Sequence, residues 1–171
     1  MGLFDEKEYE FKGQYARYCR ALGNNGLFKT FREAYVYSSL IGFLNGEKSN
    51  LKDYENNDKA SIFASDMAKR REQLRFIYHM IMLLDEEPNF TIDDYKNRTF
   101  RDEADEEHPE KLDANMRLFN SYAEGGLEYL YNQFGQYDNN EEVIDALHQY
   151  VMDFAVDIGL REREIDLNVF E

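Results

Sequence analysis

The sequence contains one cysteine, two prolines and no tryptophan. A single cysteine, Cys19, excludes an internal disulfide, and the start Met-Gly-Leu-Phe-Asp lacks the basic and apolar regions of a secretory signal. The uncharged run from Ala34 to Leu44 is far shorter than the roughly 20 residues that span a bilayer. We therefore expect a cytoplasmic protein without a membrane segment.

The few prolines, together with many Tyr, Phe, Glu and Leu residues, favour helices. The chain has 171 residues, of which 43% are hydrophobic and 15% aromatic, and such a chain can bury a substantial core. These features predict one compact all-α domain over residues 1–171, with about six helices around a buried central helix. We expect residues 1–8 and 161–171 to be flexible or docking tails.

The central helix is predicted over residues 30–46. Thr30 and Glu33 match a capping box, in which each side chain accepts a hydrogen bond from the backbone of the other residue. Apolar residues lie around the whole circumference of this helix, which predicts burial on nearly all sides. Small residues recur at every fourth position, including Ser38 and Gly42, so the backbone of another helix can approach closely.

Helical spacing of apolar residues predicts five further helices. They cover residues 9–22, 60–84, 91–101, 112–134 and 140–158. Gly125 and Gly126 lie inside the fourth of these, and two glycines within a helix cost about 2 kcal/mol relative to alanine. We expect the pair to admit a closely packed neighbour or to form a tight kink.

Residues 161–171 differ from the rest of the chain because apolar and polar side chains alternate, which is the period of a strand. The apolar members are Ile165, Leu167 and Val169. We expect this half-buried strand either to pack on its own domain or to dock on a partner or a second copy by strand addition. These three residues are therefore candidate partner-binding residues, and no other stretch offers an obvious strand to pair with them.

The formal net charge of -15 opposes non-specific binding to nucleic acid, which depends on Lys and Arg displacing counterions from phosphates. A protein partner is therefore favoured, including a basic or nucleic-acid-binding protein, and a homo-oligomer stays open. The acidic surface either keeps the protein soluble or imitates DNA and inhibits a nucleic-acid-binding protein. Carboxylates at phosphate-like spacing on one elongated face would favour the DNA mimic.

The only basic cluster lies in the predicted helix over residues 60–84. It consists of Lys69, Arg70, Arg71 and Arg75, which are further candidate partner-binding residues. The simplest hypothesis is that they pair with acidic neighbours within the fold. Alternatively, they bind a partner's carboxylates, or the phosphates of nucleic acid in a nucleic-acid-binding subunit.

No motif for catalysis, for a metal or for a cofactor is found. A helix-bundle di-iron site needs two Glu-x-x-His pairs and two further Glu residues, whereas only Asp145 and His148 have comparable spacing. Cys19 lies on an apolar helix face without an evident base, and His79 is surrounded by core residues, so both are expected to be structural. Residues 102–110 are strongly acidic but lack the pattern of a calcium loop, and we expect a solvated loop. The sequence therefore predicts a protein that is not an enzyme and has no cofactor.

Two segments resemble a known family, the small Dnd-associated proteins found with bacterial DNA phosphorothioation systems. Residues 28–46, FKTFREAYVYSSLIGFLNG, resemble the family's segment with a phenylalanine, a short helix start and an apolar Ala/Ile-Gly-Phe run. Residues 119–130, FNSYAEGGLEYL, are similar to its Tyr-Ala-x-Gly-Gly-Leu-x-x-Leu element. The resemblance implies a non-enzymatic accessory protein of a DNA-modification or phage-defence locus. It does not imply that the chain modifies DNA itself.

Overall fold

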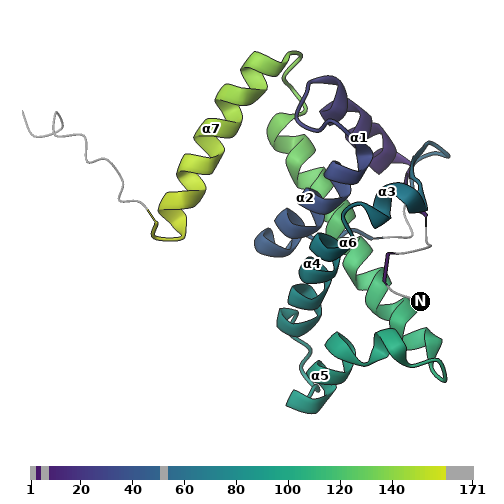
Figure 1. The fold of residues 1–171 in the computed structure, drawn as a ribbon. Helices are drawn as coiled ribbons and strands as arrows, with labels where there is room; N and C mark the ends of the chain where they lie inside the picture. The colour runs from purple at the N-terminus through teal and green to yellow at the C-terminus, as the bar shows by residue number, and fades with distance from the viewer. Residues whose placement is uncertain (1–2, 5–7, 51–53, 161–171) are drawn as a thin grey trace, which may run out of the picture.

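The structure is a computed structural model that describes residues 3–4, 8–50 and 54–160. Within them the chain forms seven α-helices, one 3-10 helix and a two-stranded sheet, which confirms the predicted all-α class (Figure 1). The helices are α1 (Gln14–Asn24), α2 (Phe31–Asn45), α3 (Ala64–Ala68), α4 (Arg71–Leu84), α5 (Ile92–Phe100), α6 (Pro109–Phe134) and α7 (Asn140–Asp157). The remaining elements are β1 (Tyr9–Lys12), β2 (Lys59–Ile62) and the 3-10 helix η1 (Asp102–Ala104).

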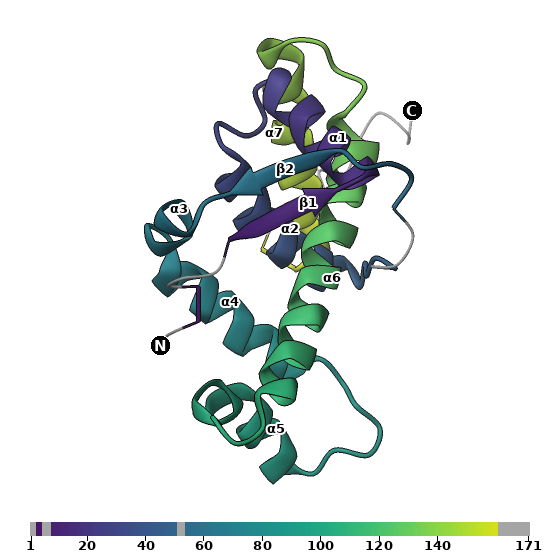
Figure 2. The ribbon, with the colours of Figure 1, turned by 90° about the vertical axis from the view of Figure 1, so that its right-hand side faces the viewer.

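Helices α2 and α6 form the centre of the fold and contact each other more extensively than any other pair of the described elements (Figure 2). Their backbones meet at glycines. A side-chain carbon added to Gly42 would overlap the carbonyl of Tyr122, and one added to Gly126 would overlap the carbonyl of Ser38. Helix α6 continues unbroken through its glycine pair. The prediction that these glycines admit a closely packed neighbour is therefore confirmed.

The start and the outer face of α2 differ from the prediction. Thr30 accepts a hydrogen bond from the backbone N–H of Glu33 at 3.1 Å, as expected, but the Glu33 carboxylate accepts from the backbone N–H of Lys29 at 2.9 Å. Burial on nearly all sides is wrong for one face, where Tyr37 and Leu44 are 47% and 49% exposed. Apolar residues occupy the exposed face as well as the buried one, so the sequence pattern does not distinguish the two faces.

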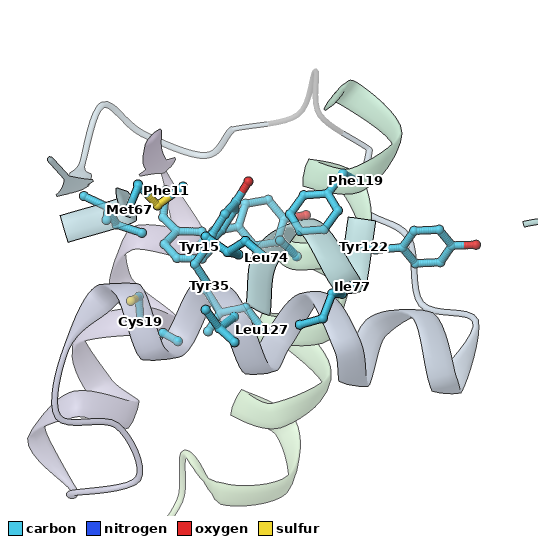
Figure 3. Close-up of a cluster of buried hydrophobic side chains, with 14 of the residues drawn as sticks. Phe11, Tyr15, Cys19, Tyr35, Met67, Leu74, Ile77, Phe119, Tyr122 and Leu127 are labelled. Carbon is cyan, nitrogen blue, oxygen red and sulfur yellow. The ribbon is translucent and has the colours of Figure 1, made fainter. Parts of the chain in front are cut away.

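One hydrophobic core joins the N-terminal residues to α1, α2, α4 and α6 (Figure 3). At its centre the ring of Tyr35 lies 6.0 Å from the ring of Phe11 and 5.5 Å from that of Phe119, measured between centroids. Leu3 and Phe4 are 5% and 4% exposed and belong to the same core. Leu3 and Phe4 therefore form part of the core, and the tail over residues 1–8 stays a prediction, because residues 1–2 and 5–7 lie outside the described residues.

The two-stranded sheet corrects two predicted helices. Strands β1 and β2 pair antiparallel, with Tyr9 opposite Ile62, at the places where helices were expected to begin over residues 9–22 and 60–84. Each strand has four residues, which is too short for a period of two to be distinguished from one helical turn. Gly13, with a φ of 56°, turns the chain from β1 into α1. The rest of the second predicted helix divides into α3 and α4.

The predicted helices in the second half of the chain are confirmed. Thr91 and Asp94 form a complete capping box at the start of α5. Helix α6 begins at Pro109, a residue that fits the first turn because its missing N–H is not needed there. At the start of α7 the side chain of Asn139 accepts a hydrogen bond from the backbone N–H of Glu142 at 3.0 Å. Capping side chains therefore mark the starts of α5 and α7, whereas α6 begins three residues before the predicted start at residue 112.

A buried cluster of charged groups fixes the end of α4. Arg98 is 6% exposed and donates hydrogen bonds to the backbone carbonyls of Met82 and Asp85. The Asp85 carboxylate, in a residue that is 4% exposed, contacts the ammonium of Lys48 at 2.7 Å and accepts a hydrogen bond from the hydroxyl of Tyr122. These contacts satisfy carbonyls at a helix end and link α4 to α5, α6 and the loop after α2.

The acidic run at residues 102–110 is partly structural, which corrects the expectation of a solvated loop. Asp102 is 9% exposed and accepts a hydrogen bond from the side-chain amide of Asn115 at 3.0 Å. Glu103 accepts one from the backbone N–H of Leu3 at 3.3 Å. Acidic composition predicts solvation only on average, and here two carboxylates provide acceptors for buried donors.

Glu124 is a buried carboxylate held by hydroxyl groups. It is 1% exposed, and its oxygens accept hydrogen bonds from Tyr9 at 3.2 Å, Tyr54 at 3.2 Å and Ser49 at 2.8 Å. Burial raises the pKa of Glu124 above its ordinary value, although the three hydroxyls act in the opposite direction. Because the donors come from β1 and from the loop after α2, Glu124 attaches both segments to α6.

Replacing Gly42 by alanine is expected to lower the free energy of unfolding by at least about 2 kcal/mol, because the new methyl group overlaps the backbone of α6. The matched control is Gly23→Ala in α1, where the added carbon finds its nearest neighbour, the carbonyl of Phe28, at 3.8 Å. The control is expected to be neutral or to gain up to about 1 kcal/mol from its higher helix propensity. Urea unfolding followed by circular dichroism measures both. Equal unfolding midpoints for the two variants would contradict the close crossing.

The raised pKa of Glu124 predicts a specific pH dependence. The folded state holds this proton more tightly than the unfolded state, so the contribution of Glu124 to stability is fully present below its unfolded pKa and is lost as the pH rises through the folded pKa. Glu124→Gln does not titrate at this position. The free energy of unfolding of the wild type minus that of Glu124→Gln should therefore decrease from about pH 4 to pH 7, as measured by urea unfolding. A difference that grows with pH would show that the carboxylate is stabilised as an anion.

Candidate interaction surface

Helix α7 packs on the rest of the protein along one edge of its apolar face. Val143 is 1% exposed, and the ring of Tyr150 lies 5.7 Å from that of Phe134. Beyond these contacts α7 extends as an arm along one side of the molecule (Figure 1). Helix α7 is therefore anchored on the end of α6 at positions as far along as Tyr150.

The other edge of this apolar face is exposed. It consists of Ile144, Leu147, Val151 and Ile158, which are between 37% and 55% exposed. Their spacings of three, four and seven residues place them on one side of the helix, and we call them the α7 edge. An apolar patch that its own domain does not cover is typical of a site of interaction.

The rest of the α7 surface is acidic. Between residues 140 and 157 the sequence has no Lys or Arg, and its acidic residues are Glu141, Glu142, Asp145, Asp153 and Asp157. The α7 edge is thus an apolar strip on a negatively charged helix. Such a surface is complementary to an apolar surface with basic borders.

The outer face of α2 also contains exposed apolar side chains. Tyr37, Leu40 and Leu44 follow one another at spacings of three and four residues, opposite the glycine contact with α6. Tyr37 and Leu44 are exposed, whereas Leu40 is half-buried. The helix that organises the fold therefore buries its small residues and exposes part of its apolar surface.

The basic cluster lies at the junction of α3 and α4. Arg70 is exposed and precedes the first residue of α4. The other three members form ion pairs within the fold: Lys69 with Asp66 at 2.6 Å, Arg71 with Glu72 at 3.3 Å and Arg75 with Glu103 at 3.4 Å. This is the internal pairing that the simplest hypothesis predicted, and partner binding by the cluster stays a prediction.

Ile165, Leu167 and Val169 lie outside the residues that the structure describes, and their role as a docking strand stays a prediction. Sequence reasoning placed partner binding in that segment and missed the α7 edge. An amphipathic helix is ordinarily assumed to bury its apolar face on its own domain. Only the structure shows that this domain covers one edge of α7 and leaves the other exposed.

The residues considered for catalysis or metal binding are dispersed. Cys19 is 1% exposed, and burial raises the pKa of its thiol to about 12, so the reactive thiolate is not formed at neutral pH. Burial also lowers the pKa of His79, whose Nε2 lies 3.8 Å from the carboxylate of Glu103. Asp145 and His148 are exposed on α7. In the described part of the chain, no three His, Cys, Asp or Glu side chains are grouped in a way that could hold a metal ion.

A family model described as DNA sulphur modification system-associated protein 4 matches residues 14–157. The chain belongs to this family. The match runs from the first residue of α1 to the last residue of α7, so it includes Ile144, Leu147 and Val151 of the α7 edge and ends one residue before Ile158. The Dnd-associated resemblance of residues 28–46 and 119–130 is therefore confirmed, and these two segments contain the glycines of the α2–α6 contact. Neither the curated proteins nor the solved structures include a significant match to the chain.

Membership of the DNA sulphur modification system-associated protein 4 family gives the chain an accessory role in a DNA-modification system. Association with such a system means that its other components are the natural candidates for partners. None of the helices in residues 3–4, 8–50 and 54–160 has the length and apolar character needed to cross a bilayer.

Because the ion pairs of Lys69 and Arg71 lie at the surface, we expect charge reversal there to change the melting temperature little. Lys69→Glu should leave the melting temperature almost unchanged, because the pair with Asp66 is exposed and surface pairs contribute little. Arg98→Met, in contrast, should lower the free energy of unfolding by about 3 kcal/mol or more, because it leaves the buried Asp85 carboxylate without that cation. Thermal melts of both variants test this difference. If Lys69→Glu were as destabilising as Arg98→Met, the cluster would be a structural element of the fold.

Proposed function

We propose that the protein is a non-enzymatic accessory component that binds another protein of its DNA sulphur modification system through the α7 edge. The observation that carries this proposal is the exposure of Ile144, Leu147, Val151 and Ile158 along one side of α7, and the first three of these residues lie within the matched region. Exposed apolar surface of this kind is costly in water, and a partner that covers it gains the corresponding hydrophobic free energy.

The non-enzymatic role is supported by the chemistry of the described side chains. Cys19, the single cysteine, is buried with a protonated thiol. The buried carboxylate of Glu124 is occupied by three hydroxyl donors, and that of Asp85 by Lys48 and Tyr122. These two carboxylates hold segments of the chain in place, so their role is structural. The family description, system-associated, is in keeping with such a role.

The charges around the α7 edge indicate the chemistry of the partner. Helix α7 has only acidic charged side chains, and the whole chain has a formal net charge of -15. A partner with an apolar helix bordered by Lys and Arg would be attracted by this field and matched by the apolar strip. We therefore propose a basic protein as the partner, and a protein that binds DNA phosphates through Lys and Arg would fit this description. The DNA-mimic alternative needs carboxylates at phosphate-like spacing on one face, and three of the 35 acidic residues, Asp85, Asp102 and Glu124, are buried and do not contribute to such a face.

Titration calorimetry with each purified protein component of such a system tests this proposal. One component is expected to bind the wild-type chain, and Leu147→Asp should weaken that binding at least about tenfold, because it places a charge in the apolar strip. Higher salt should weaken the complex further. The matched control is Gln149→Asp, the same new residue at an exposed position of α7 that does not lie three or four residues from any member of the α7 edge.

The control is expected to leave the dissociation constant within about twofold of the wild-type value, and equal losses in the two variants would count against the α7 edge. Absence of binding by every component would overturn the proposal. Sedimentation of the chain alone provides the remaining outcome. A wild-type dimer that Leu147→Asp dissociates would assign the edge to a second copy of the chain.

A further inference from the structure

A second surface feature is a pocket between α1, the loop that precedes α2 and the segment that joins β2 to α3. Its volume is about 660 Å³, which falls within the range of about 300–1,000 Å³ for small-molecule sites. The residues that line it include Arg20, Lys29, Arg32, Phe31 and Phe63. None of the α7 edge residues lines this pocket, so the ligand of the pocket is independent of the protein partner proposed for the α7 edge.

The pocket is positively charged in a protein that is acidic overall. Arg20, Lys29 and Arg32 line it from three neighbouring segments, and Asp66 is the one acidic residue among the lining side chains. Asp66 is itself bound by Lys69 at 2.6 Å and by Arg32 at 3.5 Å, and Lys69 lowers its pKa, so it stays an anion at neutral pH. The remaining positive charge favours an anionic ligand.

Arg32 and Lys29 each have a donor group without a protein partner among the described residues. The Nε atom of Arg32 is buried and has no hydrogen-bond partner among the described residues. Lys29 is exposed and forms no ion pair with any residue that the structure describes. Arg20 donates to the backbone carbonyl of Lys59, and its Nη1 lies 4.0 Å from the carboxylate of Asp58. Guanidinium and ammonium groups arranged around a cavity in this way suit the oxygens of a phosphate.

Aromatic rings adjoin these cations. Phe63, which follows β2 directly, is 59% exposed, and Phe31 in the first turn of α2 is half-buried. Both line the pocket. An exposed ring beside positive charges is the arrangement on which proteins stack the bases of single nucleotides while they bind the phosphate.

We infer that this pocket binds a nucleotide unit, with its phosphate on Arg20, Lys29 and Arg32 and its base on Phe63. The net charge of -15 repels a long polyanion, so the ligand is one nucleotide rather than a duplex. Two sources supply this chemistry: a free nucleoside 5′-monophosphate, and the phosphorylated 5′ end of a single strand. This inference does not depend on the proposed function.

Titration calorimetry at low salt tests the inference with inorganic phosphate, deoxyadenosine and deoxyadenosine 5′-monophosphate as probes. The monophosphate should bind more tightly than either of the other two. Phe63→Leu should weaken its binding about tenfold and leave phosphate binding unchanged, because only the base loses a contact. Lys29→Glu should weaken both phosphate-containing probes at least about tenfold.

The matched controls are Phe76→Leu in α4, where the ring is 70% exposed, and Lys96→Glu in α5, and both should bind as the wild type does. A 5′-phosphorylated dinucleotide that binds better than the monophosphate identifies a strand end as the ligand, and the reverse order identifies a free nucleotide. Circular dichroism confirms that each variant is folded.

Three results would overturn the inference: no binding of the monophosphate at millimolar concentration, binding that Phe63→Leu and Lys29→Glu do not affect, or binding of phosphate with no gain from the nucleoside. Leu147→Asp, which tests the protein partner, should bind the monophosphate normally. Failure of one proposal therefore leaves the other intact.

Discussion

The backbone contact between α2 and α6 at Gly42 and Gly126 is the constraint on which the rest of the fold depends. Because no side chain separates the helices there, the loop that follows α2 also lies directly on α6, with the carbonyl of Glu47 against Gly125. This position brings the loop within reach of the buried carboxylate of Glu124. One close crossing thus determines where the loop, β1 and the charged cluster at the end of α4 are attached.

The parts of this arrangement that could be predicted are those with a local chemical signature. Small residues four apart in α2 and the glycine pair in α6 predicted close packing, and the Thr30 cap predicted the start of α2. Features that arise from contacts distant in the sequence could not be predicted. Strands of four residues have too few positions to show a period, and the role of Glu124 depends on hydroxyls from segments 70 to 115 residues away.

In the candidate sites too, features with a local sequence signature could be predicted, and features that depend on distant contacts could not. Basic residues at positions 69–75 were recognised as a cluster because they are adjacent in the sequence, but three of them pair within the fold. The cations of the proposed nucleotide pocket come from separate segments and were missed for that reason. The helix over residues 140–158 was predicted from its apolar spacing, whereas the exposure of the α7 edge depends on how little of α7 the rest of the protein covers. Periodicity identifies an apolar face, and only the tertiary structure decides what covers it.

The central claim is that the α2–α6 contact holds the fold together while the α7 edge is left exposed for a partner. Hydrogen exchange of the isolated chain measures this most directly, because each amide exchanges at a rate set by the opening of its own helix. We expect the slowest amides in α2 and α6 around Gly42 and Gly126, and much faster exchange in α7 from Val151 onward. Amides in that part of α7 that exchange as slowly as those of α6 would contradict the account, because the α7 edge would then be covered in the isolated chain.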